Sequence, residues 1–384
     1  MTGELALALD VWDPQRGGLE AYADHLARGL AARGFRPRLL LGEARTTPDV
    51  PHEILGGKGV EFYRRLDAIV DEEGHATTDG APLLSFRHPG ARCRVFLPLG
   101  GLLASSLAAR RAAEPVPLAL PRRLARALSP RTHSYVAREE AFFGTRDPGR
   151  LALVASDLIA EDVRSRFPGF EGSIQITGLP IQEDRFLPAG PQLRRRLRKD
   201  KLASAEAGPV LLWIGNDPKR KGLTIARKVL ERFRMRKLDA RLLLAGHGTQ
   251  AWDDRDKGLY GLGHVDPAPL YSMSDILIAP SLEDGFHLAL VEALAAGVPV
   301  VCSARCGASM LIHDRSLARV VQEPQDLDGF DLDALSLCAR GMLSFDKMEA
   351  RRLMVESCFL DRHLDHLAHL LVDHLPSLRP GVTS

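Results

Sequence analysis

Residues 5–41 read LALALDVWDPQRGGLEAYADHLARGLAARGFRPRLLL, and their pattern sets the expected fold class. The first five residues, all apolar, predict a buried strand, after which a loop leads to Gly17 and Gly18. Apolar residues at helical spacing then predict a helix that ends at Gly34, and residues 38–41 predict a second strand. A strand, a helix and a strand in this order form a βαβ unit, so the sequence predicts an α/β fold with a parallel sheet.

The same alternation of strand and helix continues along the chain. Together these segments predict two doubly wound α/β domains that face each other across a cleft, where open parallel sheets bind their ligands. Further strands are expected at residues 83–86, 93–97, 151–155, 174–177, 210–214, 241–245, 276–279, 298–302 and 318–321, and helices in the second half at 222–236, 268–273 and 288–296.

A basic stretch divides the two halves. The length of 384 residues allows two domains with separate cores. Residues 188–208 are polar and rich in arginine and lysine, and we interpret them as a linker between domains at 1–187 and 209–365. A helical tail at 366–384 is expected to pack back on the first domain.

Composition limits the class of protein. Hydrophobic residues make up 45% and charged residues 26%, as in soluble globular proteins. The net charge of +2 gives no overall basic field, so nucleic acid is not an expected partner. Five cysteines without a C-x-x-C pair predict reduced thiols in a cytoplasmic protein. The N-terminus lacks the basic segment of a secretory leader, and no apolar run reaches the about 18 residues of a membrane-spanning helix.

The densest chemical pattern is the segment 280–301, PSLEDGFHLALVEALAAGVPVV. A strand ends at its start, and a helix begins near His287 and stops at Gly297. That helix is apolar almost all round, so it is expected to be buried, and Glu292 in its middle needs hydrogen-bond partners such as ribose hydroxyls. The alternative is that Glu292 pairs with a core arginine.

The loop before this helix carries its own chemistry. The amides of Phe286, His287 and Leu288 open the helix and predict a phosphate site, and Gly285 keeps the backbone accessible. Asp284 lies eight positions before the buried glutamate, where it is able to hold sugar hydroxyls. The alternative for Asp284 is a simple helix cap.

Two other loops suit anionic groups. The segment 215–222, GNDPKRKG, follows a predicted strand, and its three cations include Arg220 and Lys221, which favour phosphate binding over a solvated charge run. Gly17 and Gly18 open the first helix, where a backbone is able to approach a bound group. These two glycines do not form G-x-G-x-x-G, so a dinucleotide fold is not the best interpretation.

Taken together, these three patterns resemble the GT-B glycosyltransferases, specifically the large retaining family four. The resemblance consists of the paired glycines after the first strand, the Arg-Lys-Gly loop after the first strand of the second domain, and an acid-x7-acid loop and helix. Residues 259–266 and 270–275 resemble the base-binding loop of that family and the helix after it. Within the family, residues 215–217, 306–308 and 135–143 are most similar to the glucosyltransferases that act on the heptose of the lipopolysaccharide core.

The resemblance implies a retaining, metal-independent transfer of a hexose, with glucose favoured, from a nucleotide diphosphate sugar to a lipid-linked or lipopolysaccharide core saccharide. No cofactor is implied, and a UDP-sugar is the favoured donor. The first domain would then bind the acceptor and the second the nucleotide sugar. The implied catalytic residues are Arg220, Lys221 and Asp284, and the implied donor-binding residues are Gly17, Gly18, His264, Val265, Gly285, Phe286, His287, Leu288 and Glu292.

The chain departs from the family pattern at three places. The first acid is Asp284 in place of glutamate, and His287 stands where the family has glycine. The His or Asp that the family carries after an early strand falls at residues 99–101, Leu-Gly-Gly, where no side chain titrates. A catalytically silent GT-B protein that binds a partner or a nucleotide sugar is therefore the alternative function, and a nucleotide-sugar epimerase on the same fold is a third.

Residues 102–138 hold seven arginines and a single acidic residue, Glu114. Such a stretch favours an anionic membrane surface or a phosphorylated glycolipid acceptor, and the alternative is a solvated helical face. We therefore expect a cytoplasmic protein that associates peripherally with the inner face of the inner membrane. The residues expected to meet the acceptor or the membrane are Arg110, Arg111, Arg122, Arg123 and Arg126.

Overall fold

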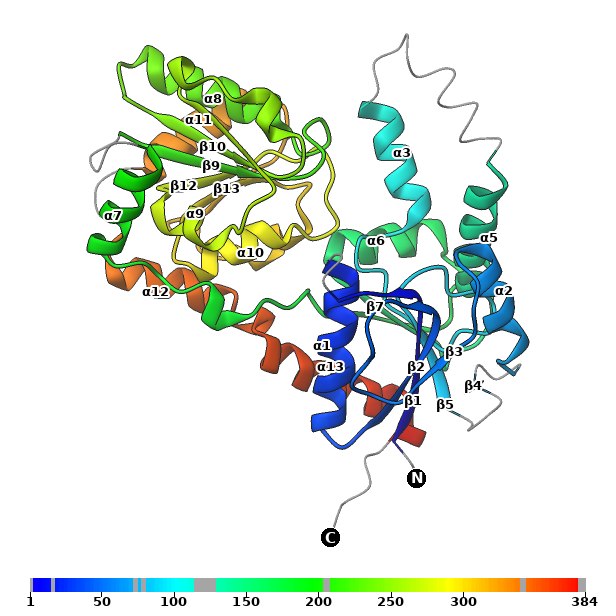
Figure 1. Cartoon of the computed structure of the whole chain (residues 1–384). Coiled ribbons are helices and arrows are strands. Elements are labelled where there is room, and N and C mark those ends of the chain that lie inside the picture. Colours follow the sequence, from blue (N-terminus) through cyan, green and yellow to red (C-terminus); the bar gives the residue numbers. More distant parts are fainter. Residues whose placement is uncertain are drawn as a thin grey trace. The chain divides into compact units, whose positions relative to one another are not determined.

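The structure is a computed structural model that describes residues 3–14, 18–71, 75–76, 81–113, 129–202, 208–338 and 343–378. It divides into two compact units (Figure 1). The first unit comprises Met1–Gly178 and Asp361–Ser384, and the second comprises Leu179–Leu360. The sequence placed the boundaries at 187 and 365, whereas the chain changes unit at Gly178 and again at Leu360.

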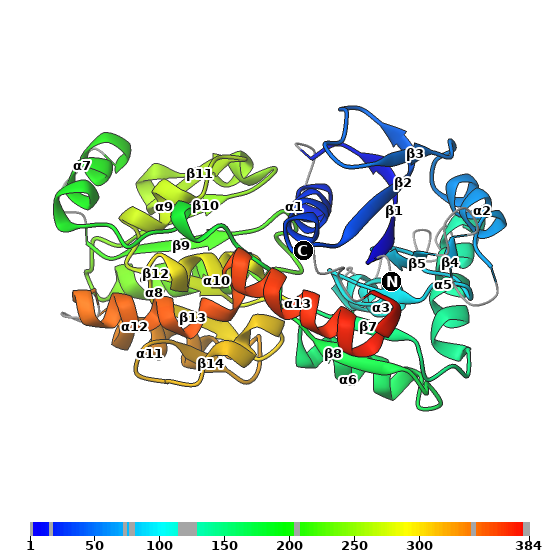
Figure 2. The same ribbon diagram turned by 90° about the horizontal axis from the view of Figure 1, so that it is seen from below.

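The first unit is built on one parallel sheet with helices on it (Figure 2). A short strand, β4 (His75–Ala76), pairs antiparallel with β5. The parallel strands follow the order β3 (His52–Ile54), β2 (Arg36–Ala44), β1 (Glu4–Trp12), β5 (Ala81–Ser85), β6 (Val95–Phe96), β7 (Leu151–Val154) and β8 (Ser173–Ile176). The helices are α1 (Gly18–Ala32), α2 (Val60–Ala68), α3 (Leu103–Ala113), α5 (Pro130–Gly144), α6 (Asp157–Arg166) and α13 (Leu360–His374).

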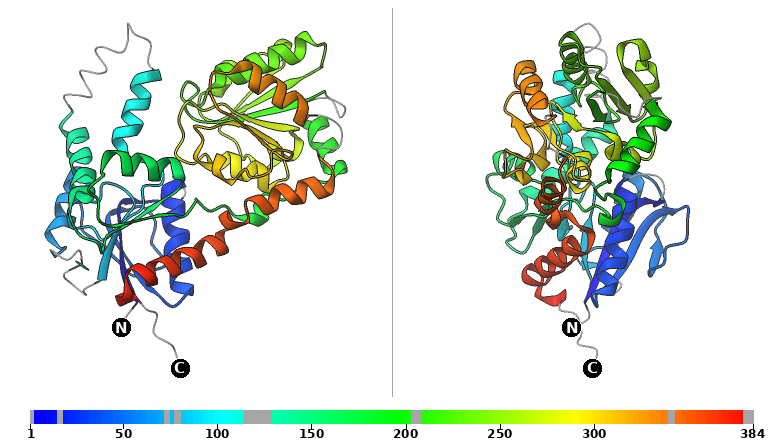
Figure 3. Two further views of the ribbon diagram at one scale, coloured as in Figure 1. Left: turned by 180° about the vertical axis from the view of Figure 1, so that it is seen from behind. Right: turned by 90° about the vertical axis from the view of Figure 1, so that its left-hand side faces the viewer.

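Helix α13 comes from the end of the chain and lies alongside α1 (Figure 3). His363 of α13 is fully buried, and its Nε2 lies 2.9 Å from the hydroxyl of Tyr22. Its Nδ1 lies 3.1 Å from the carbonyl oxygen of Thr177. Burial lowers the pKa of His363 to about 4, so the ring is neutral and joins α1, α13 and the end of β8 through two hydrogen bonds.

The second unit holds a parallel sheet in the strand order that doubly wound folds have, which confirms the predicted fold class. Its strands follow the order β11 (Leu259–Gly263), β10 (Arg241–Ala245), β9 (Val210–Ile214), β12 (Ile276–Ala279), β13 (Val300–Ser303) and β14 (Arg319–Val321). Its helices are α7 (Pro191–Leu202), α8 (Leu223–Met235), α9 (Ala268–Met273), α10 (Leu288–Ala295), α11 (Leu327–Leu337) and α12 (Phe345–Met354). Short 3-10 turns occur at Glu183–Arg185, Thr249–Trp252, Arg255–Lys257, Gly307–Leu311, Glu356–Cys358 and Pro376–Leu378.

Helices cover both faces of this second sheet. In Figure 1, α8 and α11 lie on one side of the strands, and α9 and α10 lie on the other. Leu211 and Trp213 of β9 join the core beneath α8 and α11, together with Phe233 of α8 and Phe330 of α11. Strands β9, β10 and β12 are covered on both faces, so their sequences are apolar without alternation, and this made them easy to predict.

The basic stretch that the sequence marked as a linker contains helix α7. Arg194 and Arg198 of this helix form ion pairs with Asp275 at 2.5 and 2.7 Å. Arg198 also donates from Nε to the carbonyl oxygen of Met273 at 2.9 Å. Its polar, basic composition predicts a linker, but two of its arginines bind the second unit, which begins before it at Leu179.

The strand order places a switch point between β9 and β12. From β9 the chain winds outward to β10 and β11, and from β12 it winds the other way to β13 and β14. Loops that follow two such strands separate at the carboxyl edge of the sheet and leave room for a ligand there. Gly222 in the loop after β9 has a φ of 69°, and a Cβ on it would lie 1.9 Å from the carbonyl oxygen of Pro280.

We predict that Gly222→Ala destabilises the protein more than Gly248→Ala does. Both glycines have left-handed φ values, 69° and 78°, so each alanine incurs a conformational cost of about 1 kcal/mol. At Gly248 a Cβ meets nothing within 4 Å, whereas at Gly222 it meets the backbone of Pro280. Urea denaturation of the two variants measures the difference, and equal free energies of unfolding would show that the two loops are not in close contact.

Candidate functional site

The loop after β9 and the loop after β12 are joined at the carboxyl edge of the second sheet. The amide of Leu282 donates to the carbonyl oxygen of Arg220 at 2.8 Å, and Nη1 of Arg220 donates to the carbonyl oxygen of Glu283 at 2.7 Å. Nε1 of the buried Trp213 donates to the carbonyl oxygen of Lys221 at 3.0 Å. The two predicted cations are therefore held by main-chain bonds in a defined place.

Lys221 and Asp284 form an ion pair across the two loops. Both side chains are largely buried, with 14% of Lys221 and 12% of Asp284 exposed. Burial acts to raise the pKa of Asp284, but the interactions with Lys221, His287 and Arg220 together outweigh it and lower the pKa to about 2. The carboxylate is thus ionised at neutral pH, and the structure brings these two predicted residues together with Arg220.

His287 lies beside this ion pair. Its Nδ1 is 3.2 Å from Oδ2 of Asp284, 3.4 Å from Oγ of Ser281 and 3.5 Å from Sγ of Cys306. Burial, and then the charge of Lys221, lower the pKa of His287 to about 3, so the ring is neutral at neutral pH. Its φ of 72° is left-handed, which is uncommon for a residue other than glycine.

The main chain before α10 is fixed by a third loop, which follows β13. The amide of Asp284 donates to the carbonyl oxygen of Arg305 at 2.9 Å, and the amide of Gly307 donates back to Asp284 at 2.9 Å. The amide of Ala308 donates to the carbonyl oxygen of Phe286 at 2.7 Å. Residues 284–286 therefore lead rigidly into α10, whose first amides have no acceptor within the helix.

Glu292 lies in the middle of α10, and its partner is a tyrosine. Oε2 of Glu292 accepts a hydrogen bond from the hydroxyl of Tyr271 at 2.6 Å. Burial raises the pKa of Glu292, although the bond from Tyr271 acts against this. The sequence did not predict Tyr271, because the partners that it suggested for Glu292 were a core arginine or ribose hydroxyls. The residue that caps α10 is His287, without a side-chain capping bond, so the alternative role of Asp284 as a helix cap is wrong.

A pair of histidines lies at the ends of β10 and β11. The rings of His247 and His264 are stacked, with centroids 4.4 Å apart and planes at 4°. The amide of His247 donates to Oδ1 of Asn216 at 2.9 Å, and Val265 beside the pair is 40% exposed. The sequence predicted His264 and Val265 but not His247. The signal for His247 is that Gly246 and Gly248 on either side of it mark a loop at the end of a strand.

The site residues predicted in the first half of the chain either lie in the first unit or fall outside the residues that the structure describes. Gly18 begins α1 and is exposed, and Gly17 lies outside the described residues. Arg110 and Arg111 belong to α3, but their side chains are not described. The structure does not describe Arg122, Arg123 or Arg126, so the predicted acceptor or membrane contacts of this stretch stay predictions.

A buried carboxyl group lies near residues 99–101, where the family carries a His or Asp and this sequence has no titratable side chain. Glu139 of α5 accepts hydrogen bonds from the amide of Leu103 at 3.0 and 3.2 Å, at the start of α3 just after Gly100 and Gly101. Burial raises the pKa of Glu139 to about 8. Sequence spacing did not reveal this group because it comes from a different helix.

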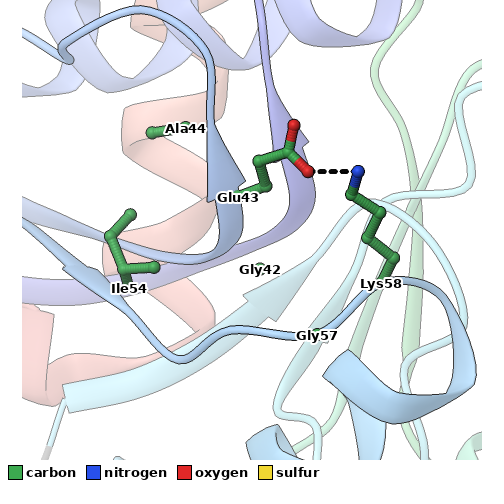
Figure 4. A pocket seen from close by; sticks show the side chains of 6 residues that line it. All are labelled: Gly42, Glu43, Ala44, Ile54, Gly57 and Lys58. Atoms are coloured by element: carbon green, nitrogen blue, oxygen red, sulfur yellow. Dashed lines mark ion pairs between the residues drawn. The ribbon is translucent and has the colours of Figure 1, made fainter.

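The first unit has a hollow of about 430 Å³ at the carboxyl ends of β2 and β3 (Figure 4). An ion pair between Glu43 and Lys58 crosses it, and Arg45 also contacts Glu43 at 3.2 Å. The hydrogen bonds from Lys58 and Arg45 lower the pKa of Glu43. Sequence analysis named none of these residues. The hollow is lined by Gly42, Glu43, Ala44, Ile54, Gly57 and Lys58.

The described residues lack two other features. No group of three or more His, Cys, Asp or Glu side chains in the described ranges is arranged to hold a metal ion. Among the helices that the structure describes, none has the length and apolar character needed to cross a membrane.

The second unit is similar in sequence to known proteins. Residues 208–338 match the family model described as glycosyl transferases group 1. The chain is 27% identical over 216 residues to the O-antigen chain mannosyltransferase B of Escherichia coli, over 51% of this chain and 54% of that protein. It is 26% identical over 209 residues to the lipopolysaccharide glucosyltransferase WaaG of Escherichia coli K12, over 51% of this chain and 55% of that protein. The chain thus spans about half the length of the curated relatives it matches.

Solved structures extend the similarity to the whole fold. The crystal structure of WaaG superposes with a TM-score of 0.71 and 20% identity, over 95% of this chain and 99% of that chain. Anabaena Alr3699/HepE in complex with UDP-glucose superposes with a TM-score of 0.64 and 14% identity, over 96% and 99%. These findings confirm the predicted GT-B fold of two Rossmann-like units and the resemblance to glycosyltransferases.

We predict that Glu292→Gln stabilises the protein and that the gain grows with pH. Because burial raises the pKa of Glu292 above 4.5, the folded protein keeps a proton that the unfolded chain releases, so wild-type stability falls as the pH rises above 4.5. Glutamine still accepts a bond from Tyr271 and does not ionise. Urea denaturation at pH 5 and pH 8 measures the difference.

The control is Tyr271→Phe, which removes the bond to Glu292 and leaves the carboxylate in place. It is expected to be destabilised by about 0.5–1.5 kcal/mol, as for hydrogen bonds between neutral groups, since the folded protein keeps the proton of Glu292. An advantage of Glu292→Gln that stays the same between pH 5 and pH 8 would mean that the pKa of Glu292 is not raised in the folded protein.

Proposed function

We propose that this chain transfers a hexose from a nucleotide diphosphate sugar to a saccharide acceptor. The observation that carries the proposal is the arrangement of Arg220, Lys221 and Asp284 at the switch point of the second sheet, directly before the start of α10. This arrangement lies within residues 208–338, which match the glycosyl transferases group 1 model. Glycosyl transfer from such donors needs an anion site for a diphosphate next to groups that hold a sugar.

Each residue of the site has a role in this proposal. Arg220 and Lys221 neutralise the diphosphate, and the amides of residues 286–288 add the field of a helix N-terminus. Asp284 accepts hydrogen bonds from the hexose hydroxyls. Glu292, which already accepts from Tyr271 through one oxygen, accepts from the ribose hydroxyls through the other.

The transfer breaks the bond between the anomeric carbon and the β-phosphate oxygen and forms a bond from that carbon to an acceptor oxygen. The nucleoside diphosphate leaves with the bonding electron pair, and its departing oxygen takes up the proton that the acceptor hydroxyl loses. Arg220 and Lys221 stabilise the negative charge that develops on the leaving phosphate. We therefore propose a metal-independent reaction, with retention of anomeric configuration as the family resemblance implies.

The donor and the acceptor are proposed from the relatives. WaaG is named a lipopolysaccharide glucosyltransferase, and HepE binds UDP-glucose, so we propose a UDP-hexose donor, with glucose favoured, and a lipid-linked or lipopolysaccharide core acceptor. The arginine-rich stretch around α3 is proposed to contact a glycolipid or an anionic membrane surface on the cytoplasmic side.

We place the acceptor saccharide in the hollow of the first unit. It lies at the carboxyl ends of two parallel strands, where α/β sheets bind ligands. The carboxylate of Glu43 and the ammonium of Lys58 suit sugar hydroxyls, and Ile54, which is 51% exposed, offers an apolar surface to a sugar ring.

A catalytically silent protein that only binds the nucleotide sugar is the second candidate function. The absence of a titratable side chain at Gly100 supports it, and the buried Glu139 nearby argues against it. Both candidates predict donor binding, and only the transferase predicts release of the nucleoside diphosphate.

We predict that Lys221→Ala lowers the rate of hexose transfer by at least about a hundredfold while the fold stays intact, because it removes a cation from the developing phosphate charge. The matched control is Lys219→Ala, an exposed cation on the same loop. Purified protein is assayed with UDP-, GDP- and ADP-hexoses for transfer and hydrolysis. Near-normal turnover of Lys221→Ala would refute its assignment.

We predict that Glu43→Gln raises the KM for the acceptor about tenfold and leaves the KM for the donor unchanged, since about 1.4 kcal/mol of binding energy corresponds to tenfold in affinity. Glu53→Gln is the control, because Glu53 lies on the adjacent strand β3 but does not line the hollow. Steady-state kinetics with a heptose-containing core saccharide measures both constants. An unchanged acceptor KM in Glu43→Gln would place the acceptor elsewhere.

A further inference from the structure

We propose that His287 is a positioning residue that holds Asp284 in place when Lys221 moves from this carboxylate to the donor diphosphate. The inference rests on the proposed function, because it assumes that Lys221 binds a diphosphate. It goes beyond the resemblance, since the family has glycine at this position and a glycine has no side chain to offer.

The backbone conformation of His287 is unusual for a residue that has a side chain. His287 has a φ of 72° and a ψ of 72°, where a side chain costs about 1 kcal/mol relative to glycine. Its side chain is only 3% exposed, so it does not gain solvation in return. A residue that keeps a left-handed conformation next to a candidate active site points to a functional constraint.

Lys221 and His287 lie against the same oxygen of Asp284. Nζ of Lys221 and Nδ1 of His287 both contact Oδ2 of Asp284. The ring is neutral, so one of its nitrogens carries a proton. With this proton on Nδ1, the nearest acceptor is Oδ2 of Asp284 at 3.2 Å, ahead of Ser281 and Cys306. His287 and Lys221 therefore compete for the same lone pairs, and the ammonium is held less tightly than it would be as the sole partner.

Charged and polar groups surround the ring of His287. The groups that face it are Lys221 and Arg220 from the loop after β9, Asp284 from its own loop, Ser281 at the end of β12 and Cys306 after β13. Within the described residues, the buried Nε2 atom has no hydrogen-bond partner. A ring that served only packing would be expected to satisfy this atom, because buried polar groups are nearly always bonded.

Moving Lys221 away from Asp284 has a free-energy cost. A diphosphate that attracts the ammonium would leave Asp284 as a buried anion without its cation, which is strongly unfavourable. The Nδ1 proton of His287 remains on the carboxylate and reduces that penalty. Burial, the largest cause of the low pKa of His287, persists when Lys221 turns to the diphosphate, so the ring stays neutral beside Asp284.

The test compares His287→Gly and His287→Asn. Glycine removes the donor and relieves the left-handed strain, so this variant is expected to fold at least as stably as wild type. Asparagine tolerates the same backbone conformation, and its side-chain amide is able to donate to Asp284 from nearly the position of Nδ1. Isothermal titration calorimetry with UDP-glucose at pH 7.5, with thermal unfolding of each variant, is the measurement.

We expect His287→Gly to bind UDP-glucose about tenfold more weakly than wild type and His287→Asn to recover most of the affinity. A purely structural role would lower the melting temperature of His287→Gly and would leave the affinity of the folded protein unchanged. Equal affinity in wild type and His287→Gly would overturn the proposal.

The pH dependence supplies a second readout. The diphosphate of UDP-glucose is a diester that does not titrate between pH 6 and pH 8, so changes in affinity report on the protein. The affinities of wild type and His287→Asn are both expected to stay constant through this range, because burial keeps the ring of His287 neutral. An affinity of wild type that rises as the pH falls, with His287→Asn unchanged, would show a charged ring in the complex and would overturn the proposal of a neutral donor.

The outcomes separate this inference from the proposed function. If wild type binds none of UDP-, GDP- and ADP-hexoses, the proposed function fails, and the role of His287 fails with it. If wild type binds UDP-glucose and Lys221→Ala weakens that binding while His287→Gly does not, the role of His287 alone is wrong.

Discussion

The candidate site of the second unit depends on the ion pair between Lys221 and Asp284. The two residues follow different strands, β9 and β12, and lie side by side because these strands are neighbours at the point where the sheet reverses its winding. The pair keeps a cation and an anion largely out of water, where each would be costly alone. A ligand that supplies its own negative charge is therefore able to replace the carboxylate as the partner of Lys221.

Much of the second unit could be predicted from the sequence, and the reason is burial. Strands β9, β10 and β12 are covered on both faces, so their apolar runs have sharp ends. Strand β11 was missed because two glycines interrupt its pattern, and α7 was missed because its arginines resemble a solvated linker. The loops with Arg220 and Asp284 were found because charged residues directly follow apolar strands.

Contacts between distant side chains were beyond the sequence. Nothing in the spacing of Tyr271 and Glu292, or of Glu139 and Leu103, indicates that these residues touch, since each pair joins two helices. The sequence predicts a phosphate-binding role for the amide of His287 and notes its side chain as a departure from glycine. The contact of this side chain with Asp284 arises from the left-handed turn before α10. Tertiary packing thus decided which titratable groups are neutral and which are charged.

Helix α13 has a consequence for the order in which the chain acquires its structure. The first unit takes this helix from the far end of the sequence, after the whole second unit has intervened. Until it arrives, the hydroxyl of Tyr22 and the carbonyl group of Thr177 lack the imidazole that joins them, and the apolar side of α1 near Gly29 lacks Leu364. On a translating ribosome, the half that is made first is therefore completed last.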